Sequence, residues 1–160
     1  SIEKVEAGKV ALHKSNLNIQ ELLGEIVEQH QEIAQTGQII HFSYSGKRTF
    51  STDQNMLRII LSNLLSNAIK YSKQHQRVWV NIEREDEGLK IEIRDEGIGI
   101  PLNDQENMFG RFFRAQNALN IEGTGLGLNI VHRYVQMLNG TISFESMPNE
   151  GTTFSVEIPS

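Results

Sequence analysis

Two alternating apolar runs flank a short polar turn, and they restrict the choice of fold more than any other part of the chain. The apolar positions are Val78, Val80 and Ile82 in one run, and Leu89, Ile91 and Ile93 in the other. Because side chains of a strand point alternately to opposite faces, each run has one face to bury. The close spacing predicts an antiparallel hairpin whose apolar face must be covered by other elements.

Three segments have the helical spacing needed to cover such a face. Asn18 and Glu21 form a capping-box pattern that predicts a helix ending near Gly37. Thr52 and Asp53 are expected to cap a second helix that runs to about residue 71. Residues 128–139 have the pattern of a third helix, with Gly140 as its end.

Further short β-prone segments follow the first and third helices. Residues 38–44 and 48–51, with Gly46 between them, predict a hairpin. Residues 141–144 and 153–158 predict a final strand pair. Residues 95–127 fit neither period and hold six of the 13 glycines, which favours a long functional loop or lid. This order indicates an α/β sandwich with helices on one face of the sheet.

Composition excludes several classes of function. The 160 residues fit one domain, and the chain has no cysteine for a disulfide or a zinc-thiolate site. A net charge of -5 disfavours non-specific nucleic-acid binding. No apolar run approaches the roughly 20 residues of a membrane helix. None of the five histidines has metal-ligand spacing or is followed by an acidic residue.

One helix face is unusually polar. Asn63, Asn67 and Lys70 lie at i, i+4 and i+7 of the second predicted helix and therefore share one face. Such residues are ordinarily a solvated surface. An amide oxygen beside a lysine also suits Mg²⁺ and polyphosphate, which is the functional alternative.

Two glycine-containing segments could bind a ligand. Asp95 to Pro101 follows a strand directly, and its carboxylate could accept hydrogen bonds from an exocyclic amine such as that of adenine. Gly123 to Leu128 opens a helix, where backbone N–H groups favour an anion. An ordinary turn and a flexible connector are the alternatives. Between them, Phe109 to Arg114 could anchor a movable lid or form a small satellite core.

Taken in order, these motifs resemble those of sensor histidine kinases. The segments similar to the N, G1, F and G2 boxes of that family are Asn63–Ser72, Asp95–Pro101, Phe109–Arg114 and Gly123–Leu128. The tail from Gly151 to Pro159 is similar as well, so the resemblance covers roughly residues 12 to 159. It implies a Bergerat fold: a two-layer α/β sandwich whose mixed, mainly antiparallel sheet packs on helices, with a long ATP lid.

The resemblance implies that the second helix carries the phosphate end of an ATP site. Asn67 is expected to coordinate Mg²⁺, and Asn63 to lie one turn earlier beside the phosphates. Lys70 is expected to contact phosphate, and Tyr71 to border the adenine or ribose. Arg114 is expected to reach the γ-phosphate, which completes a catalytic set with Asn63, Asn67 and Lys70.

The resemblance assigns the adenine end to the segment after the hairpin. Asp95 is expected to bind the adenine amine, with Gly97 and Gly99 shaping the wall and Thr152 helping to hold an adenine-bound water. Lid backbone is expected to reach the phosphates from Gly123, Thr124, Gly125, Leu126 and Gly127.

One position indicates the type of reaction. The related ATPases carry a Glu one turn before the metal-binding Asn, where it activates water. This chain has Asn63 there, which cannot accept a proton. The resemblance therefore implies phosphoryl transfer to a histidine on a separate dimerisation domain. A conformational ATPase and a nucleotide-binding regulatory module are the alternatives.

The same resemblance implies the surroundings of the chain. Residues 1–11 are expected to be the end of a dimerisation helix or a linker, and residues 12–160 the catalytic, ATP-binding domain. The expected partners are that dimerisation and phosphoacceptor domain and the receiver domain of a response regulator. Nucleic acid and membrane contact are not expected, and the fragment is expected in the cytoplasm, with a membrane anchor elsewhere in the parent left open.

Overall fold

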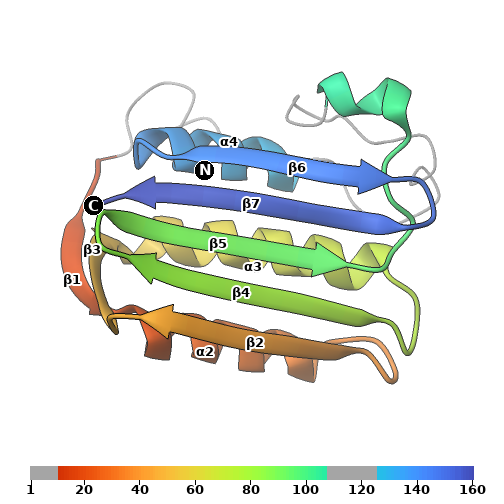
Figure 1. Cartoon of the computed structure of the whole chain (residues 1–160), viewed down its shortest axis with the longest axis horizontal. Coiled ribbons are helices and arrows are strands. Elements are labelled where there is room, and N and C mark those ends of the chain that lie inside the picture. Colours follow the sequence, from red (N-terminus) through yellow and green to blue (C-terminus); the bar gives the residue numbers. More distant parts are fainter. Residues whose placement is uncertain (1–10, 108–125) are drawn as a thin grey trace.

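The computed structural model describes residues 11–107 and 126–160. These residues form a two-layer α/β sandwich, in which a mixed five-stranded sheet has its helices on one face (Figure 1). The helices are α2 (Ile19–Glu32), α3 (Gln54–Tyr71) and α4 (Leu126–Met137). Within the described ranges, none of the helices is long and apolar enough to cross a membrane.

The main sheet has the strand order β2-β4-β5-β7-β6. Its strands are β2 (Ile39–Gly46), β4 (Arg77–Glu85), β5 (Gly88–Asp95), β6 (Thr141–Met147) and β7 (Gly151–Pro159). The neighbouring pairs are antiparallel except for β2 and β4, which are parallel. The mixed, mainly antiparallel sheet expected from the sequence is therefore confirmed.

The predicted central hairpin is present. β4 and β5 pair antiparallel, with Val80 opposite Ile93 and Ile82 opposite Ile91. All four side chains are buried against the helices, at 1% exposure or less. The alternation predicted this pairing correctly because both strands bury the same face and a short turn leaves them little choice of partner.

The expected hairpin over residues 38–51 is wrong. β2 pairs with β4, whereas β3 (Thr49–Asp53) pairs with β1 (Lys14–Asn18) in a separate two-stranded sheet. Gly46 has φ +96°, and a Cβ there would lie 2.0 Å from the Arg84 carbonyl oxygen of β4. The glycine does mark a turn, but a turn signal does not specify the strand with which the returning chain pairs.

The segment directly before the first helix is a strand that the sequence did not predict. Lys14–Asn18 form β1. Four of its five residues are exposed, so the strand has no apolar alternation that the sequence could reveal. It depends on pairing with β3, reinforced by the His13 N–H, which donates to Asp53 Oδ2 at 2.9 Å.

The helix starts agree with the caps predicted from the sequence. Asn18 Oδ1 accepts from the Glu21 N–H at 3.1 Å, and Asp53 Oδ1 accepts from the Met56 N–H at 3.0 Å. The first helix ends at Glu32, earlier than the expected stop at Gly37. Part of the expected loop after β5 is a 3₁₀ helix, η1 (Leu102–Asn107), and α4 begins at Leu126 rather than at 128.

Candidate functional site

Helix α3 positions the polar residues predicted for the phosphate end. Asn63 and Asn67 are half-buried, Lys70 is exposed and Tyr71 is half-buried. The Asn63 Nδ2 donates to the Ile59 carbonyl one turn earlier at 2.7 Å, so the amide is oriented by its own helix. Among the described residues, no hydrogen bond involves the Asn67 side chain. The helical spacing places Asn67 one turn before Tyr71 on the same face.

Asp95 ends strand β5 and is buried, with 8% of its surface exposed. One oxygen, Oδ1, accepts from the Gly97 N–H at 2.8 Å and from the Thr152 N–H at 3.2 Å. No hydrogen bond within residues 11–107 and 126–160 reaches the other oxygen, Oδ2. The carboxylate is thus fixed through one oxygen, and the second can accept a hydrogen bond from a ligand.

Burial changes the acidity of this group. Desolvation raises the pKa of Asp95 from 3.8 to about 6, and the hydrogen bonds from Gly97 and Thr152 oppose that rise. With such a pKa the carboxylate is mostly ionised at pH 7. It can therefore act as an acceptor at neutral pH and loses that capacity in mild acid.

The loop after Asp95 contacts the end of α3 directly. The Ile98 N–H donates to the Tyr71 carbonyl at 3.0 Å. A Cβ on Gly97 would lie 2.3 Å from that same carbonyl oxygen, closer than any side chain tolerates. This contact joins the last turn of α3, with Lys70 and Tyr71, to the loop that fixes Asp95.

Gly99 contacts the opposite wall of the loop. Its φ is +69°, and a Cβ there would lie 2.0 Å from the Met147 carbonyl oxygen. The Asn149 N–H donates to the Ile98 carbonyl at 2.7 Å. The requirement for glycine at this position therefore follows from protein backbone at the β6–β7 turn, in addition to any ligand.

Thr152, to which the resemblance assigned an adenine-bound water, is buried beside Asp95, and a further residue supports it. Its Oγ1 lies 2.8 Å from Ser146 Oγ. Ser146 Oγ accepts from the Ile100 N–H at 2.8 Å and lies 3.0 Å from the Gly151 carbonyl. Ser146 thus links the loop after β5 to β6 and β7. No pattern in the sequence marks this residue, because a single serine in a strand resembles any other polar strand position.

Several predicted site residues lie outside the described residues. They are the segment Phe109–Arg114, with Arg114, and the lid residues Gly123, Thr124 and Gly125. Leu126 and Gly127 form the first turn of α4, and only their backbone is described. Their roles toward phosphate remain predictions.

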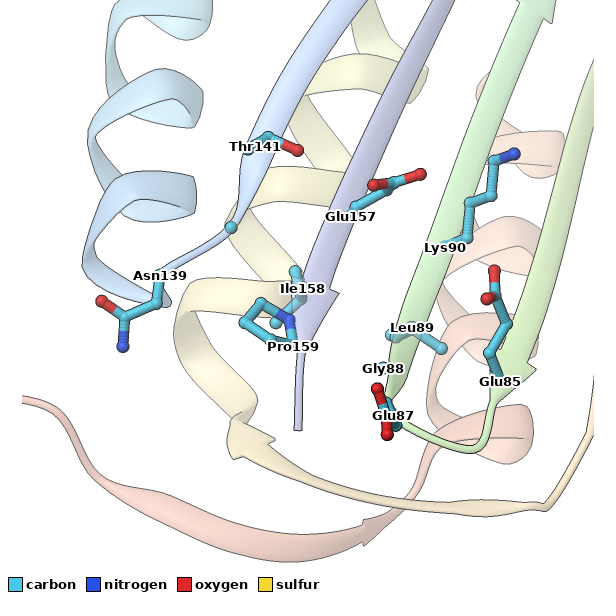
Figure 2. A pocket seen from close by; sticks show the side chains of 11 residues that line it. Glu85, Glu87, Gly88, Leu89, Lys90, Asn139, Thr141, Glu157, Ile158 and Pro159 are labelled. Atoms are coloured by element: carbon cyan, nitrogen blue, oxygen red, sulfur yellow. The ribbon is translucent and has the colours of Figure 1, made fainter.

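A hollow of about 330 Å³ lies at the other end of β5 from Asp95 (Figure 2). Its lining includes Glu85, Glu87, Lys90 and Glu157, and none of the predicted site residues. The hollow is therefore separate from the candidate site. As a separate point, no group of three or more acidic, histidine or cysteine side chains in the described part of the chain is placed to hold a metal ion.

Comparison with known proteins identifies the fold family. A family model described as histidine kinase-, DNA gyrase B- and HSP90-like ATPase matches residues 52–160. The circadian input-output histidine kinase CikA of Synechococcus elongatus is 33% identical over 99% of the chain, which spans 22% of that protein.

Two solved structures share the arrangement of the sandwich. The mycobacterial sensor histidine kinase MprB has a TM-score of 0.79 at 26% identity, with 91% of this chain and 97% of that one covered. Full-length ShkA, solved in complex with AMPPNP, has a TM-score of 0.86 at 26% identity, with 98% and 33% covered. The chain therefore belongs to the histidine kinase-, DNA gyrase B- and HSP90-like ATPase family, in which its relatives are sensor histidine kinases.

Proposed function

We propose that residues 12–160 bind Mg-ATP and donate its γ-phosphate to a histidine on a separate dimerisation domain of a two-component signalling kinase. The observation that carries the proposal is the carboxylate of Asp95, which is buried, held through Oδ1 and left with Oδ2 for a ligand. Family membership adds support, as does the complex of ShkA with AMPPNP, an ATP analogue.

The adenine end of the proposed site is formed by Asp95 and the loop that follows it. Asp95 Oδ2 accepts a hydrogen bond from the exocyclic amine of adenine, and Gly97 and Gly99 hold the loop in place. Thr152 fixes the carboxylate through its N–H. Its hydroxyl, which bonds to Ser146, is available to hold a water next to the base.

The phosphate end of the proposed site lies on α3. The chemistry of its side chains suits a magnesium–triphosphate: Asn67 offers a neutral amide oxygen, Asn63 a second amide, and exposed Lys70 a positive charge. When bound, Mg²⁺ would neutralise part of the phosphate charge. Asn67 is the residue proposed to hold the ion, and Arg114 and the lid glycines complete the phosphate contacts.

Transfer rather than hydrolysis is supported by Asn63. Its Nδ2 donates to the Ile59 carbonyl at 2.7 Å, and an amide has no basic lone pair for taking a proton from water. Positioning and charge neutralisation remain, and these suffice for phosphoryl transfer to an external nucleophile.

The acceptor and the partners lie beyond this chain. None of its five histidines is followed by an acidic residue, the pattern expected of the phosphorylated histidine in this family. The chain spans 22% of CikA, so further domains accompany it in its relatives. The proposed partners are the dimerisation and phosphoacceptor domain and a response-regulator receiver domain.

The proposal is tested with ATP labelled at the γ-phosphate. The chain is incubated alone and joined to the dimerisation domain of a relative such as CikA. Acid-labile, base-stable label on the histidine of the dimerisation domain, with none on the chain alone, is the expected result. Steady phosphate release by the chain alone would instead indicate a conformational ATPase. Binding of ATP without any transfer would indicate a regulatory module.

A further inference from the structure

The C-terminal end of α3 lacks the glycine that commonly closes a helix. The residue after Tyr71 is Ser72, in an extended conformation with φ −95° and ψ 159°. A helix ends with four backbone carbonyls that have no partner in the next turn. A glycine in the left-handed conformation would ordinarily help to satisfy them, so here other groups must do so.

Two glutamines from a distant segment supply those partners. Gln35 and Gln38 lie in the connection between α2 and β2, and we name this pair the glutamine clamp. The Gln35 Nε2 donates to the Ile69 carbonyl at 2.7 Å and to the Ser72 carbonyl at 2.9 Å. The Gln38 Nε2 donates to the Ile69 carbonyl at 3.1 Å and to the Lys73 carbonyl at 3.3 Å.

The clamp is itself held rigidly. Gln38 is 3% exposed, and its Oε1 accepts from the Gln35 N–H at 2.9 Å. The Gln38 N–H in turn donates to the Gln35 carbonyl at 3.0 Å. The Gln31 side chain ties the same segment to β2, because it donates to the Gln38 carbonyl and accepts from the Ile40 N–H. Gln31 makes no contact of this kind with α3.

The end of α3 is therefore bonded on two sides. Ala68 and Ile69 carbonyls are satisfied by the Ser72 N–H and by the clamp, whereas the Tyr71 carbonyl accepts from the Ile98 N–H of the loop after β5. That loop fixes Asp95 through the Gly97 N–H. Hydrogen bonds and the short stretches of backbone between them thus connect the clamp, through the last turn of α3, to the proposed adenine-binding carboxylate.

We propose that Gln35 and Gln38 are positioning residues of the nucleotide site, which hold the last turn of α3 where the loop after Asp95 can bond to it. This inference rests on the proposed function, because the site it serves is the proposed ATP site. The clamp does not touch nucleotide. Its effect is transmitted through the Tyr71 carbonyl. A Cβ on Gly97 would lie only 2.3 Å from that carbonyl oxygen, so the loop and the end of α3 are packed closely and a shift of one displaces the other.

The test uses Gln35→Met and, as a second variant, Gln38→Met, each of which removes the donors to α3 while keeping side-chain length. Gln29→Met is the matched control, since Gln29 is exposed on α2 and its side chain makes no hydrogen bond within the described residues. Amide hydrogen exchange of Ile98 and Gly97 is measured without nucleotide, and global stability is measured by urea unfolding. ATP affinity is then measured by calorimetry.

In the clamp variants, exchange at Ile98 is expected to accelerate about tenfold beyond any change in global stability, the effect of losing one hydrogen bond to a buried carbonyl. ATP affinity is expected to fall by about the same factor, and the control should change neither relative to its stability. Unchanged Ile98 exchange in both clamp variants, or an equal change in the control, would overturn the inference. Wild-type chain that binds no ATP would contradict the proposed function, while the exchange comparison would still decide the role of the clamp.

Discussion

The two ends of the proposed nucleotide site differ in how far they are organised without a ligand. At the adenine end, Asp95 is buried and fixed by two backbone N–H groups, and Thr152 is held by Ser146. At the phosphate end, Asn67 is half-buried and Lys70 is exposed on the surface of α3. A preformed end can bind a specific base at little entropic cost. The phosphate end, in contrast, needs the ion and the lid to complete its contacts with the ligand.

This difference predicts the largest effect for the substitution of Asp95 by Asn. The amide oxygen can still accept from Gly97 and Thr152, so the loop is preserved, but an NH₂ group replaces Oδ2 and faces the adenine amine. Loss of this charged pairing should lower ATP affinity about 30-fold, or roughly 2 kcal/mol. Calorimetry with Mg-ATP measures it. Affinity within twofold of wild type would contradict the adenine-end assignment.

The same substitution should raise the stability of the free protein at neutral pH. The folded-state pKa of Asp95 is raised to about 6, so the folded protein favours the protonated form. The protonated Asp95 side chain leaves the free energy of unfolding undiminished below pH 3.8. As the pH rises through 6, ionisation of the buried carboxyl lowers the free energy of unfolding by an amount on the order of 1–3 kcal/mol at pH 7. Urea unfolding at pH 7 should show Asp95→Asn to be more stable than wild type, and this advantage should vanish near pH 4.

ATP affinity should also depend on pH in a way that isolates the adenine end. Protonation of Asp95 below its pKa of about 6 removes the acceptor, so affinity should fall progressively from pH 7 to pH 5. Inorganic triphosphate, which lacks the base, is the control ligand because its own protonation affects only the phosphate end. In the Asp95→Asn variant the fall in affinity from pH 7 to pH 5 should be the same for ATP and for triphosphate. A larger fall for ATP in that variant, equal to the wild-type difference, would refute the explanation.

At the phosphate end, Asn67→Ala should weaken Mg-ATP about tenfold through loss of one metal ligand. Its binding of adenosine should stay unchanged, because Asp95 and its loop are intact. Titrations of adenosine and of ATP with and without Mg²⁺ separate the two ends. Equal losses for adenosine and Mg-ATP would show that the ends are not independent.

The smallest effect is expected for Ser146→Ala. It removes the acceptor of the Ile100 N–H and the partner of the Thr152 hydroxyl, which should cost about 1 kcal/mol of stability and a few-fold in ATP affinity. Ser143→Ala on the same strand is the matched control, since Ser143 is exposed on the sheet. Identical unfolding curves for the two variants would show that the hydrogen bonds of Ser146 do not stabilise the site.

Features that depend on neighbours in the chain could be predicted from the sequence, whereas features that depend on distant partners could not. The β4–β5 hairpin and the caps at Asn18 and Asp53 depend on neighbours in the chain, and the sequence predicted them. The pairing of β2 with β4 and of β1 with β3 depends on distant partners, and the local pattern of residues 38–51 indicated a wrong hairpin. Turn chemistry determines where a chain reverses, but not which strand it joins.

The candidate site divides in the same way. Asp95, Gly97 and Thr152 could be nominated because they lie in motifs that resemble a family, and the structure places them in contact. Ser146 and the glutamine clamp could not, because a serine or a glutamine is recognised as a site residue only once its distant partner is known. Their partners are 46 residues away for Ser146 and Ile100, and 34 for Gln35 and Ile69.

The proposed site depends most on a hydrogen bond from the exocyclic amine of adenine to Asp95 Oδ2, which accepts no hydrogen bond from the described residues. Calorimetry of ATP and of the purine triphosphate that lacks the 6-amino group, on wild-type chain and on Asp95→Asn, measures the contribution of this bond. Wild-type chain should prefer ATP by about tenfold or more, and the variant should bind the two nucleotides equally. Equal affinities in the wild type, or a preference that survives in the variant, would contradict the account.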